Sequence, residues 1–451
     1  MLNILISIIG IIVTLLLIIG IHEFSHFIVA RLLGIKVLRF SIGFGKKLWS
    51  CFDKKGTEYV IAAIPLGGYV KMLDAKEETV SIDDLPLTYD HQPFYKKFLV
   101  VVAGPLSNLL LAFVLYWMLF MMGFSSIAPI IGKITPHSIF AEAGIKSNVE
   151  ITRIDNIPTS SWMGVLIRIL SRTGDTSKMQ IGVKPLDKQT LQEYQINLAN
   201  WHMDNLKPDP LTSLGIEPYE PEIPAIIDKI NANSPAAESD LSSGDKILAI
   251  NGKKIANWLE LVTEIDKRPT EKINLTIERA KKQYNISVTT GSERDLLFKK
   301  HGFLGVTPQF KWPDNLIHKN QYNPFIALSH AWQNTMDFTY LNLVIIGKLF
   351  TGKVSLQSLG GPISIFQTAG TALNQGIAPF LSFLAFLSIS IGIINIFPIP
   401  GLDGGHLLFQ TIEAIIRRPI SDRVLALFYR IGFILIFLLI VQSIINDVLR
   451  L

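Results

Sequence analysis

The sequence predicts a mixed fold: a polytopic α-helical membrane protein of four transmembrane helices, with a cytoplasmic β-hairpin or sheet and two tandem domains outside the membrane. Three observations carry this prediction. Only 18% of the 451 residues are charged, and the mean hydropathy is +0.36, which is more apolar character than one soluble core requires. Four long apolar runs alternate with stretches of ordinary soluble composition. One of these stretches repeats itself, as soluble tandem domains do.

The four apolar runs have the length of membrane-spanning helices. A helix rises about 1.5 Å per residue and the hydrocarbon core of a bilayer is about 30 Å thick, so about 20 apolar residues cross it. A cleaved signal peptide is the alternative for the first run, but the run is long, no basic segment precedes it and no Ala-x-Ala site follows. The predicted spans are residues 4–21, 98–124, 377–397 and 427–445, the last interrupted by Arg430.

Basic residues cluster at one end of each span and orient the chain. Lys and Arg mark cytoplasmic ends by the positive-inside rule. Residues 125–376 and both termini then lie on the opposite side, which is the periplasm if the membrane is the inner membrane of a Gram-negative bacterium. The orienting residues are Arg31, Lys36, Arg39, Lys46, Lys47, Lys96, Lys97, Arg417, Arg418 and Arg423.

Charge and cysteine content exclude several functions. The net charge of +5 is small for this length, and no Lys/Arg run is interleaved with aromatic residues, so nucleic acid is not an expected partner. The single cysteine, Cys51, excludes an intramolecular disulfide and a Cys-rich zinc site, and we expect a buried or reduced thiol. Any metal must therefore bind to histidines and carboxylates.

The segment between the second and third spans contains two copies of one pattern. Residues 138–154 align with residues 234–250, 96 positions later (234 minus 138), and each copy ends in Leu-Gly-Ile/Val-x-Pro. The copies resemble PDZ domains, which bind peptides by adding a strand to a sheet edge. Peptide binding and simple exclusion of bulky proteins both remain open as roles.

The turn residues of the two copies differ. In the second copy Gly244-Asp245 precedes an alternating apolar strand and Asn251-Gly252 follows it, which is turn chemistry on both sides of a strand. The first copy has Asn148-Val149 and Asp155-Asn156 at these places, so it matches less well.

After the repeat, residues 338–350 are apolar but too few to span, and they sit beside Asp337 and Lys348. We expect a helix at the outer membrane surface or packed on the bundle. The predicted division of the chain is a first span at 1–34, a cytoplasmic β segment at 35–97, a second span at 98–124, PDZ domains at 125–220 and 221–310, the interfacial helix at 320–352, a linker at 353–376, a third span at 377–405, a cytoplasmic loop at 406–426, a fourth span at 427–446 and a tail at 447–451.

The first predicted span ends in a His-Glu-Phe-Ser-His motif. Two histidines four residues apart share one face of a helix and can bind one Zn²⁺, with the glutamate beside them as general base. Ionisable groups at the end of a bilayer helix cost about 2 to 3 kcal/mol each, so they persist mainly where they bind, pair or face water. We interpret His22 and His26 as zinc ligands and Glu23 as the catalytic residue. Polar residues that merely reach the membrane interface are the alternative.

A third ligand has to come from another helix, because a catalytic zinc site keeps its fourth position for water or substrate. The third span runs into Asn-Ile-Phe-Pro-Ile-Pro-Gly-Leu-Asp-Gly-Gly, where prolines and glycines interrupt helical hydrogen bonding. Irregular backbone at this depth is tolerated only where protein or water shields it. The break places Asp403 at the depth of His22 and His26. His406 and Glu413 compete as ligands, but a helix resumed after the break carries them away. The remaining histidines, expected at surface or packing positions, are His91, His137, His202, His301, His318 and His330.

These motifs resemble the site-2 proteases, membrane-embedded zinc peptidases that cut other proteins within their transmembrane segments. The resemblance implies that His22, His26 and Asp403 bind zinc, that Glu23 is the catalytic base and that Asn395 contacts the substrate backbone. It extends along nearly the whole chain through Arg-Phe-Ser-Ile-Gly-Phe-Gly at 39–45, Gly-Gly-Tyr-Val-Lys-Met at 67–72, Val-Ala-Gly-Pro-Leu-Ser-Asn at 102–108 and Gly-Pro-Ile-Ser-Ile at 361–365.

The resemblance also implies regulated intramembrane proteolysis in a bacterial inner membrane. The expected substrates are single-span proteins already trimmed outside, of the anti-sigma-factor type in the sigma-E stress response, and remnant signal peptides. The PDZ domains would gate their access. Residues 40–44, 47–52 and 57–64 read as strands with a turn at 53–56, and their exposed edge would pair with an unwound substrate. A packing role for these strands is the alternative.

Three other functions fit parts of the sequence. A membrane-anchored zinc protease that acts on soluble chains shares the His-Glu-x-x-His helix but usually holds it outside the bilayer. An inactive PDZ scaffold need not keep Glu23 and Asp403 together with both histidines. A transporter of the common repeat type has related membrane halves, whereas the repeat here lies outside the membrane. The oligomeric state stays open.

Overall fold

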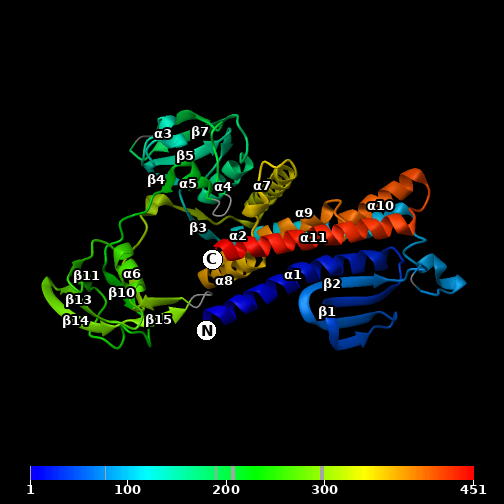
Figure 1. Cartoon of the computed structure of the whole chain (residues 1–451), viewed down its shortest axis with the longest axis horizontal. Helices are drawn as coiled ribbons and strands as arrows, with labels where there is room; N and C mark the ends of the chain where they lie inside the picture. The colour runs from blue at the N-terminus through cyan, green and yellow to red at the C-terminus, as the bar shows by residue number, and fades with distance from the viewer. Residues whose placement is uncertain (1, 77, 188–189, 205–208, 295–298, 451) are drawn as a thin grey trace.

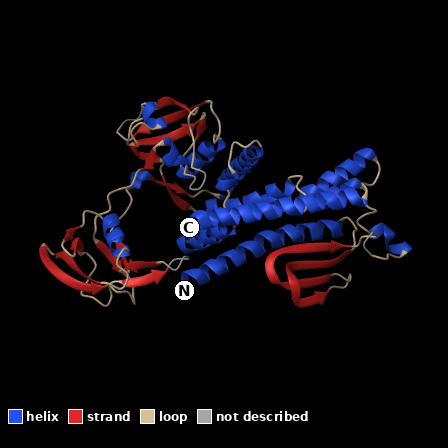
Figure 2. Ribbon diagram, in the orientation of Figure 1, coloured by secondary structure: helices blue, strands red, loops and turns tan. Residues whose placement is uncertain are grey.

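The computed structural model is an elongated helical bundle with a β-hairpin at one end and two β-domains at the other (Figures 1 and 2). It describes residues 2–76, 78–187, 190–204, 209–294 and 299–450. We call the two ends of the bundle the hairpin end and the domain end. The chain begins at the domain end, and its last helix returns there (Figure 1).

All four predicted spans are helices long and apolar enough to cross a membrane. The first does not end at residue 21 but continues to Leu32, because apolar residues persist beyond the His-Glu-x-x-His motif. The last continues to Arg450 through the predicted tail, whose final residue lies outside the described part of the chain. These helices are α1 (Leu2–Leu32), α2 (Phe94–Met122), α9 (Ile377–Ile396) and α11 (Asp422–Arg450).

α2 and α9 form the centre of the bundle. Tyr116 and Leu119 of α2 and Leu384 and Ile389 of α9 are all buried in the largest apolar core, which also receives residues from α1. Only 6% of the most apolar stretch of α11 is buried, so this helix lies at the periphery of the described bundle. The His-Glu-x-x-His motif on α1 is therefore held against a packed α2–α9 pair.

α7 (Pro324–Phe350) accompanies the spans and packs on the bundle, the second of the two predicted placements. Its first turn is capped by Asn323, whose side-chain oxygen accepts from the Ile326 N–H at 2.9 Å. Ala327 and Phe338 face the common core. α7 thus lies within the predicted helical segment 320–352, although only its second half forms the apolar run 338–350.

Two shorter helices lie where the predicted division of the chain has a linker and a cytoplasmic loop, although a helix was expected to resume after the break. α8 (Pro362–Gln375) lies in the segment predicted to be a linker, and it packs against α1, where a Cβ at Gly10 would lie 3.4 Å from the Ala369 carbonyl oxygen. α10 (Asp403–Ile416) occupies the end of the predicted third span and most of the predicted cytoplasmic loop. Glycines and prolines flank both helices, and these residues suggest loops when the sequence is considered alone.

β1 (Val37–Phe52) and β2 (Glu58–Met72) form the hairpin and cover the three strands predicted there. Each of the two strands bends so that different parts of β2 pair with both sides of β1. Arg39, for example, lies opposite both Lys71 and Glu58. The four strand segments follow the order 68–72, 37–42, 58–62 and 47–52, which leaves 68–72 at an edge.

Aromatic side chains hold the hairpin against α1. The ring of Phe27 lies 5.4 Å from that of Phe40 and 5.7 Å from that of Tyr59, measured between centroids. Cys51, expected to be a buried or reduced thiol, is free and exposed on β1, because its strand segment lies at the outer edge of the hairpin.

At the domain end, each copy of the repeat forms a β-domain with its own apolar core. In the first β-domain (residues 128–219) the elements are β4 (Ile130–Ile134), α3 (Ile139–Glu142), β5 (Val149–Ile154), β6 (Ile157–Pro158), α4 (Trp162–Ser171), β7 (Lys178–Pro185), β8 (Gln192–Asn197), α5 (Pro210–Leu214) and β9 (Ile216–Pro218). In the second (residues 225–308) they are β10 (Ile227–Ile230), β11 (Lys246–Ile250), β12 (Lys253–Lys254), α6 (Trp258–Asp266), β13 (Lys272–Arg279), β14 (Lys282–Thr289), β15 (Gly291–Arg294), β16 (Lys300–Phe303) and β17 (Val306–Pro308).

The two domains share one order of elements. The strands of the first follow the order β8-β7-β5-β4-β9, with β6 on β5, and the second has β12-β11-β13-β14 with β10 on β17. The Leu-Gly tails form β9 and β17, which pair with the first strand of their own domain. The chain enters and leaves both domains through a ribbon of β3 (Phe124–Ile127) and β18 (Ile317–Asn320).

The weaker match of the first copy has a conformational explanation. Asn148 and Gly244 both have a left-handed backbone, with φ of 60° and 89°. Asp155-Asn156 and Asn251-Gly252 also have positive φ at both positions, as a type I′ turn requires. Asn and Asp tolerate this region better than other non-glycine residues, so the substitutions keep the turns.

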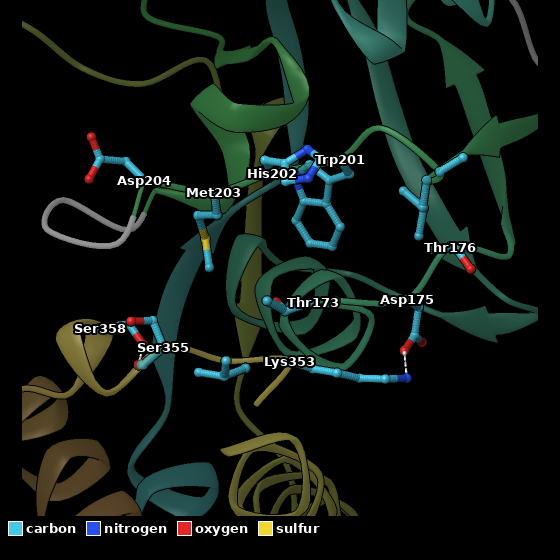
Figure 3. Close-up of a pocket in the computed structure, with 14 residues that line it drawn as sticks. Thr173, Asp175, Thr176, Trp201, His202, Met203, Asp204, Lys353, Ser355 and Ser358 are labelled. Carbon is cyan, nitrogen blue, oxygen red and sulfur yellow. Dashed lines mark hydrogen bonds and ion pairs between the residues drawn. The ribbon is translucent and has the colours of Figure 1, made fainter. Parts of the chain in front are cut away.

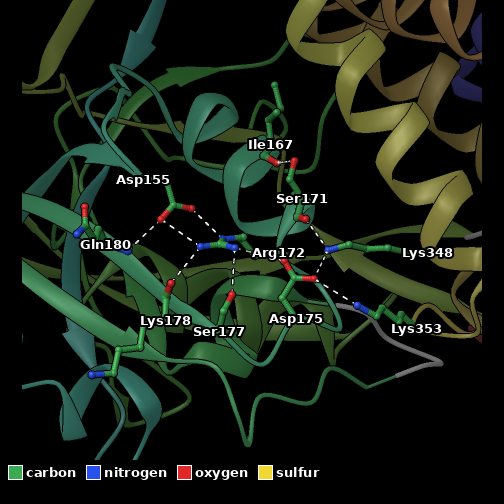
Figure 4. Close-up of polar contacts among 10 residues, drawn as sticks. All are labelled: Asp155, Ile167, Ser171, Arg172, Asp175, Ser177, Lys178, Gln180, Lys348 and Lys353. Carbon is green, nitrogen blue, oxygen red and sulfur yellow. Dashed lines mark hydrogen bonds and ion pairs between the residues drawn. The ribbon is translucent and has the colours of Figure 1, made fainter.

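The first β-domain is attached to α7 by half-buried ion pairs. Arg168 of α4 donates to Asp337 at 2.6 Å. Lys348 donates to the Ser171 carbonyl at 2.5 Å and pairs with Asp175 at 3.0 Å (Figure 4), and burial lowers the pKa of Lys348. A cavity of about 320 Å³ lies beside this contact, between the domain and residues 353–358 (Figure 3). The domain is thus fixed to a helix of the bundle through desolvated ion pairs.

The second β-domain contains a carboxylate surrounded by cations. Glu264 on α6 is 8% exposed and pairs with Lys253 at 2.8 Å, Arg268 at 2.9 Å and Lys267 at 3.3 Å. The hydrogen bonds from these cations, that from Lys253 first, lower the pKa of Glu264 from 4.5 to about 2.

We expect Glu264→Gln to reduce the stability of the second β-domain at neutral pH but not near pH 2. A depressed pKa in the folded state contributes stability above the unfolded value of 4.5, and that contribution is lost as the pH falls towards 2. Hydrogen exchange of residues 225–308 in the full chain, compared between wild type and variant at each pH, measures this. A difference that is constant between pH 6 and pH 2.5 contradicts the assignment.

Candidate metal centre

His22 and His26 lie one turn apart on α1, and both are 7% exposed. Their Nε2 atoms are 3.2 Å apart and their ring centroids 4.8 Å apart. The motif does not stand at the end of the helix as predicted, because α1 continues ten residues beyond His22, or about 15 Å. The two imidazoles therefore lie within the apolar stretch Ile9–Leu32.

The third predicted ligand reaches the histidines through the predicted break. α9 ends at Ile396, and Pro398, Pro400 and Gly401, with φ of 91°, carry the chain to the start of α10. A Cβ at Gly404 would overlap the backbone carbonyls of Phe397 and Ile396. This tight fold requires glycine, and it places Asp403 at the first residue of α10.

The three side chains form a compact donor set. Asp403 Oδ2 lies 3.0 Å from His22 Nε2 and 3.4 Å from His26 Nε2. Two ring nitrogens and a carboxylate oxygen bound tetrahedrally at the usual zinc distances are about 3.3 Å apart. These residues are also the one group of His, Cys, Asp and Glu among the described residues whose donor atoms converge as metal ligands do. The observed spacing therefore fits a zinc ion with one position left open.

Hydrogen bonds from α2 orient both imidazoles. His26 Nδ1 donates to the Val100 carbonyl at 2.7 Å, which leaves Nε2 free to bind a metal. His22 Nδ1 lies 3.2 Å from the Asn108 amide, whose Oδ1 is buried without a partner. Rotating that amide by 180° lets Oδ1 accept from His22 Nδ1–H, which satisfies both groups and frees His22 Nε2.

α2 approaches the histidines closely at a glycine. A Cβ at Gly104 would overlap the Nε2 atoms of both His22 and His26. Pro105 follows and removes one helical N–H in this turn. Neither Gly104 nor Asn108 was assigned a role from the sequence. The available signal was a polar amide and a Gly-Pro pair inside an apolar span, where such residues are costly without a partner.

Glu23 lies beside the donor set and next to the hairpin. It is within electrostatic reach of His22, His26 and Asp403. A Cβ at Gly68 would lie 2.9 Å from Glu23 Cγ, so the backbone of the edge segment 68–72 runs past this carboxylate.

Asn395 and the competing ligands occupy other positions. Asn395 lies in the last turn of α9, where its amide donates to the Ile391 carbonyl at 3.0 Å. His406 Nδ1 bonds to the Tyr429 hydroxyl at 3.0 Å, and Glu413 accepts from the Ile420 N–H at 3.0 Å. Neither belongs to the converging donor set.

None of the remaining six histidines belongs to the converging donor set. His137 is exposed, His91 lies 3.0 Å from Asp90, and His318 lies 3.8 Å from Glu150. His202 bonds to the Asn200 carbonyl at 2.9 Å, His301 pairs with Asp266 at 2.8 Å, and His330 stacks on Tyr322 at 4.1 Å.

The fold and the donor set define a membrane-spanning metallopeptidase. The chain belongs to peptidase family M50, whose model matches residues 10–439. It is 41% identical to Protease RseP of Yersinia pestis over 452 residues, with 100% of both chains covered. It is 40% identical to the Regulator of sigma-E protease RseP of Escherichia coli K12, with 98% of both covered. A putative zinc metalloprotease of Vibrio cholerae is 39% identical, with 100% of both covered.

The protein is therefore a zinc-dependent protease similar over its whole length to RseP proteins. Among solved structures, the PDZ domain of an SdrC-like protein of Listeria innocua matches 20% of this chain and 96% of its own, at 17% identity and a TM-score of 0.17.

We expect Asn108→Leu to weaken zinc binding by about 10- to 100-fold, because His22 loses the group that orients it. Asn108→Asp should retain zinc, since a carboxylate oxygen can accept from His22 Nδ1–H. Competition with a chelator on the purified full chain measures the affinity. Ser107→Ala is the matched control, because Ser107 donates to two backbone carbonyls, those of Gly104 at 2.7 Å and Ile21 at 3.5 Å, and bonds to neither imidazole. Equal zinc retention in the Leu variant and the control rejects this role.

Proposed function

We propose that this protein hydrolyses peptide bonds within the transmembrane segments of single-span membrane proteins. The observation that carries the proposal is the depth of the donor set: His22 and His26 lie within the apolar stretch of α1, about 15 Å before its end. A site at that depth serves a substrate that is itself in the membrane. His22, His26 and Asp403 hold the zinc ion, and Glu23 is the catalytic base.

The proposed orientation follows the basic residues. Lys and Arg cluster at the hairpin end, at Arg31, Lys96, Lys97 and Arg417 among others. The hairpin end then faces the cytoplasm of a Gram-negative cell, and the β-domains lie in the periplasm. The active site is nearer the cytoplasmic side of the inner membrane.

The proposed chemistry divides between the ion and one side chain. Zinc, when bound, acts as a Lewis acid on the scissile carbonyl and lowers the pKa of a water molecule. The Glu23 carboxylate accepts a proton from the attacking water and delivers it to the leaving amide nitrogen. The hydrogen bonds that His26 makes to the Val100 carbonyl and His22 to the Asn108 amide keep both imidazoles in the tautomer that binds zinc.

A helical substrate has to unwind before attack, because its carbonyls are held in its own hydrogen bonds. The edge segment 68–72 of the hairpin passes Glu23 at Gly68 and offers backbone groups to an extended chain. Asn395, in the last turn before the break, is the proposed contact for the substrate backbone.

The two β-domains are the proposed gate. They are formed by the two copies of the repeat that resembles PDZ domains, and the first is fixed to α7 by Arg168–Asp337 and Lys348–Asp175. In this position they would hinder proteins with bulky periplasmic parts. The proposed substrates are single-span proteins trimmed beforehand, of the anti-sigma-factor type, and remnant signal peptides.

We expect Glu23→Gln to retain zinc but to lower cleavage of a membrane-spanning reporter by at least about 10²-fold, because the proton acceptor is lost. Asp403→Ala should lose zinc as well as activity. Cleavage and metal content are measured on the purified full chain. His406→Ala is the matched control for metal content, since His406 lies outside the donor set. Undiminished cleavage by the Gln variant rejects the mechanism.

Replacing residues 129–314 with a short linker should relax substrate selection, because it removes both β-domains and keeps the β3–β18 ribbon. Reporters with a large periplasmic domain should then be cut, while a trimmed reporter is still cleaved to some extent. Cleavage of both reporters before and after the deletion measures this. Loss of all cleavage in a folded, zinc-loaded variant argues against gating.

A further inference from the structure

We infer that a cavity at the domain end binds an extended, uncharged peptide segment as an added β-strand, and that this segment is the part of the substrate just outside the membrane. The inference rests on the proposed function for the identity of the peptide. The binding site itself is argued from the described residues alone.

The cavity has a volume of about 930 Å³ and lies between α2, α7, the start of α9 and the first β-domain. Its walls include Phe120 and Phe338 from the bundle and Trp162 from the first β-domain. A volume of this size is at the upper end of the range for ligand pockets, and it accommodates several peptide residues.

The floor of the cavity carries an unsatisfied hydroxyl. Tyr116 is 2% exposed and lines the cavity, and its ring stacks on that of Phe338 with centroids 5.8 Å apart. Its hydroxyl has no hydrogen-bond partner of good geometry among the described residues, and Ser382, its polar neighbour, lines the same space. A buried hydroxyl without a partner is costly, so a ligand with a carbonyl oxygen is favoured there.

One wall of the cavity is a strand with a free edge. β3 pairs only with β18 in the described chain, and all four of its residues line the cavity, whereas Asn320 is the one lining residue of β18. The Ala128 N–H donates to the Leu316 carbonyl at 3.0 Å. By the alternation of an antiparallel ladder, the backbone groups of Ser125 and Ile127 point away from β18. An unpaired edge is a template for another strand.

The polar lining fits a peptide backbone better than a charged ligand. Asp337 is the one carboxylate that lines the cavity, and it is paired with Arg168; no Lys or Arg lines it. A phosphate headgroup therefore has no Lys or Arg to bind. His330 also lines the cavity, and its ring stacks on Tyr322 with centroids 4.1 Å apart. Most of the other polar groups are amides and hydroxyls, which match the N–H and C=O groups of a peptide: Ser125, Ser126, Thr159, Ser160, Ser161, Asn320, Gln333 and Asn334.

The distance between the cavity and the metal centre determines which part of the substrate the cavity can hold. Asn108 contacts His22, and α2 ends at Met122, 14 residues later (122 minus 108), or about 21 Å along the helix. A chain crosses this distance in about 6 residues when extended and about 14 when helical. The substrate residues that pair with β3 should therefore lie about 6 to 14 positions from the scissile bond.

The test is site-specific disulfide cross-linking in the full chain. Cys51→Ser removes the one native cysteine, and Glu23→Gln retains uncut substrate. Ser125→Cys is introduced on β3, and single cysteines are scanned through positions 1 to 20 outside the scissile bond of a single-span reporter. Lys319→Cys is the matched control, because Lys319 lies directly opposite Ser125 on β18, is exposed and does not line the cavity.

We expect Ser125→Cys to form at least about fivefold more cross-link than Lys319→Cys, with maxima at every second reporter position, as an added strand requires. Tyr116→Phe should weaken reporter binding by about fivefold, because one hydrogen bond to the peptide is lost. Zinc binding should not change. Equal cross-linking of the two cysteines, or a helical period of three to four, overturns the inference.

Cross-linking does not depend on cleavage, so the two proposals fail separately. A wild-type enzyme that does not cut the reporter contradicts the proposed function, even if Ser125→Cys cross-links. A phospholipid that is retained at this cavity and displaced by Ser382→Phe, with no reporter cross-link, overturns the peptide assignment.

Discussion

Two imidazole nitrogens and a carboxylate oxygen lie 3.0 to 3.4 Å from one another inside a bundle of apolar helices, and this contact constrains the rest of the bundle. Without a cation, it is unfavourable to bury an ionised Asp403 carboxylate beside the lone pairs of the two imidazole nitrogens. With zinc bound as proposed, the same three side chains would tie α1 to α10 and hold both against α2. The position of Gly104 follows from this constraint, because a larger residue would displace the ligand nitrogens.

Each departure from regular backbone in the bundle occurs where it serves this contact. Pro105 interrupts α2 beside His26, and the break after Ile396 lets the chain turn so that Asp403 faces α1. Irregular backbone at membrane depth has to be sheltered by protein or water. Here Gly404 packs against the carbonyls of the break itself. Local rules of helix formation are thus broken at the site and obeyed elsewhere, as expected of a functional centre.

The sequence predicts those parts of the molecule that follow a local pattern. The four spans and the His-Glu-x-x-His helix are continuous in the chain, and prolines mark the break before Asp403. Asn108 was missed because its role depends on which helix faces His22, and no spacing along α2 contains that information. The short helix α8 was missed, and α10 was expected only as a helix resumed after the break, without its bounds, because the stability of both comes from packing on the bundle. Conversely, Asn148 looked like a defect in the repeat but keeps the left-handed turn.

The arrangement of α2 links the two ends of the bundle. Its first half carries the contacts to His22 and His26, and its last turns carry Tyr116 and lead into β3. α9 runs beside it, with Ser388 donating to the Asn108 carbonyl at 2.8 Å, and the packed core of both helices separates the cavity from the metal centre. This packing would hold the two proposed sites at a constant distance, so that a chain bound at one would be presented to the other in a fixed register. Positioning of this kind lowers the entropy cost of the reaction. Since α11 is little buried, the α2–α9 pair is the element that can set this distance.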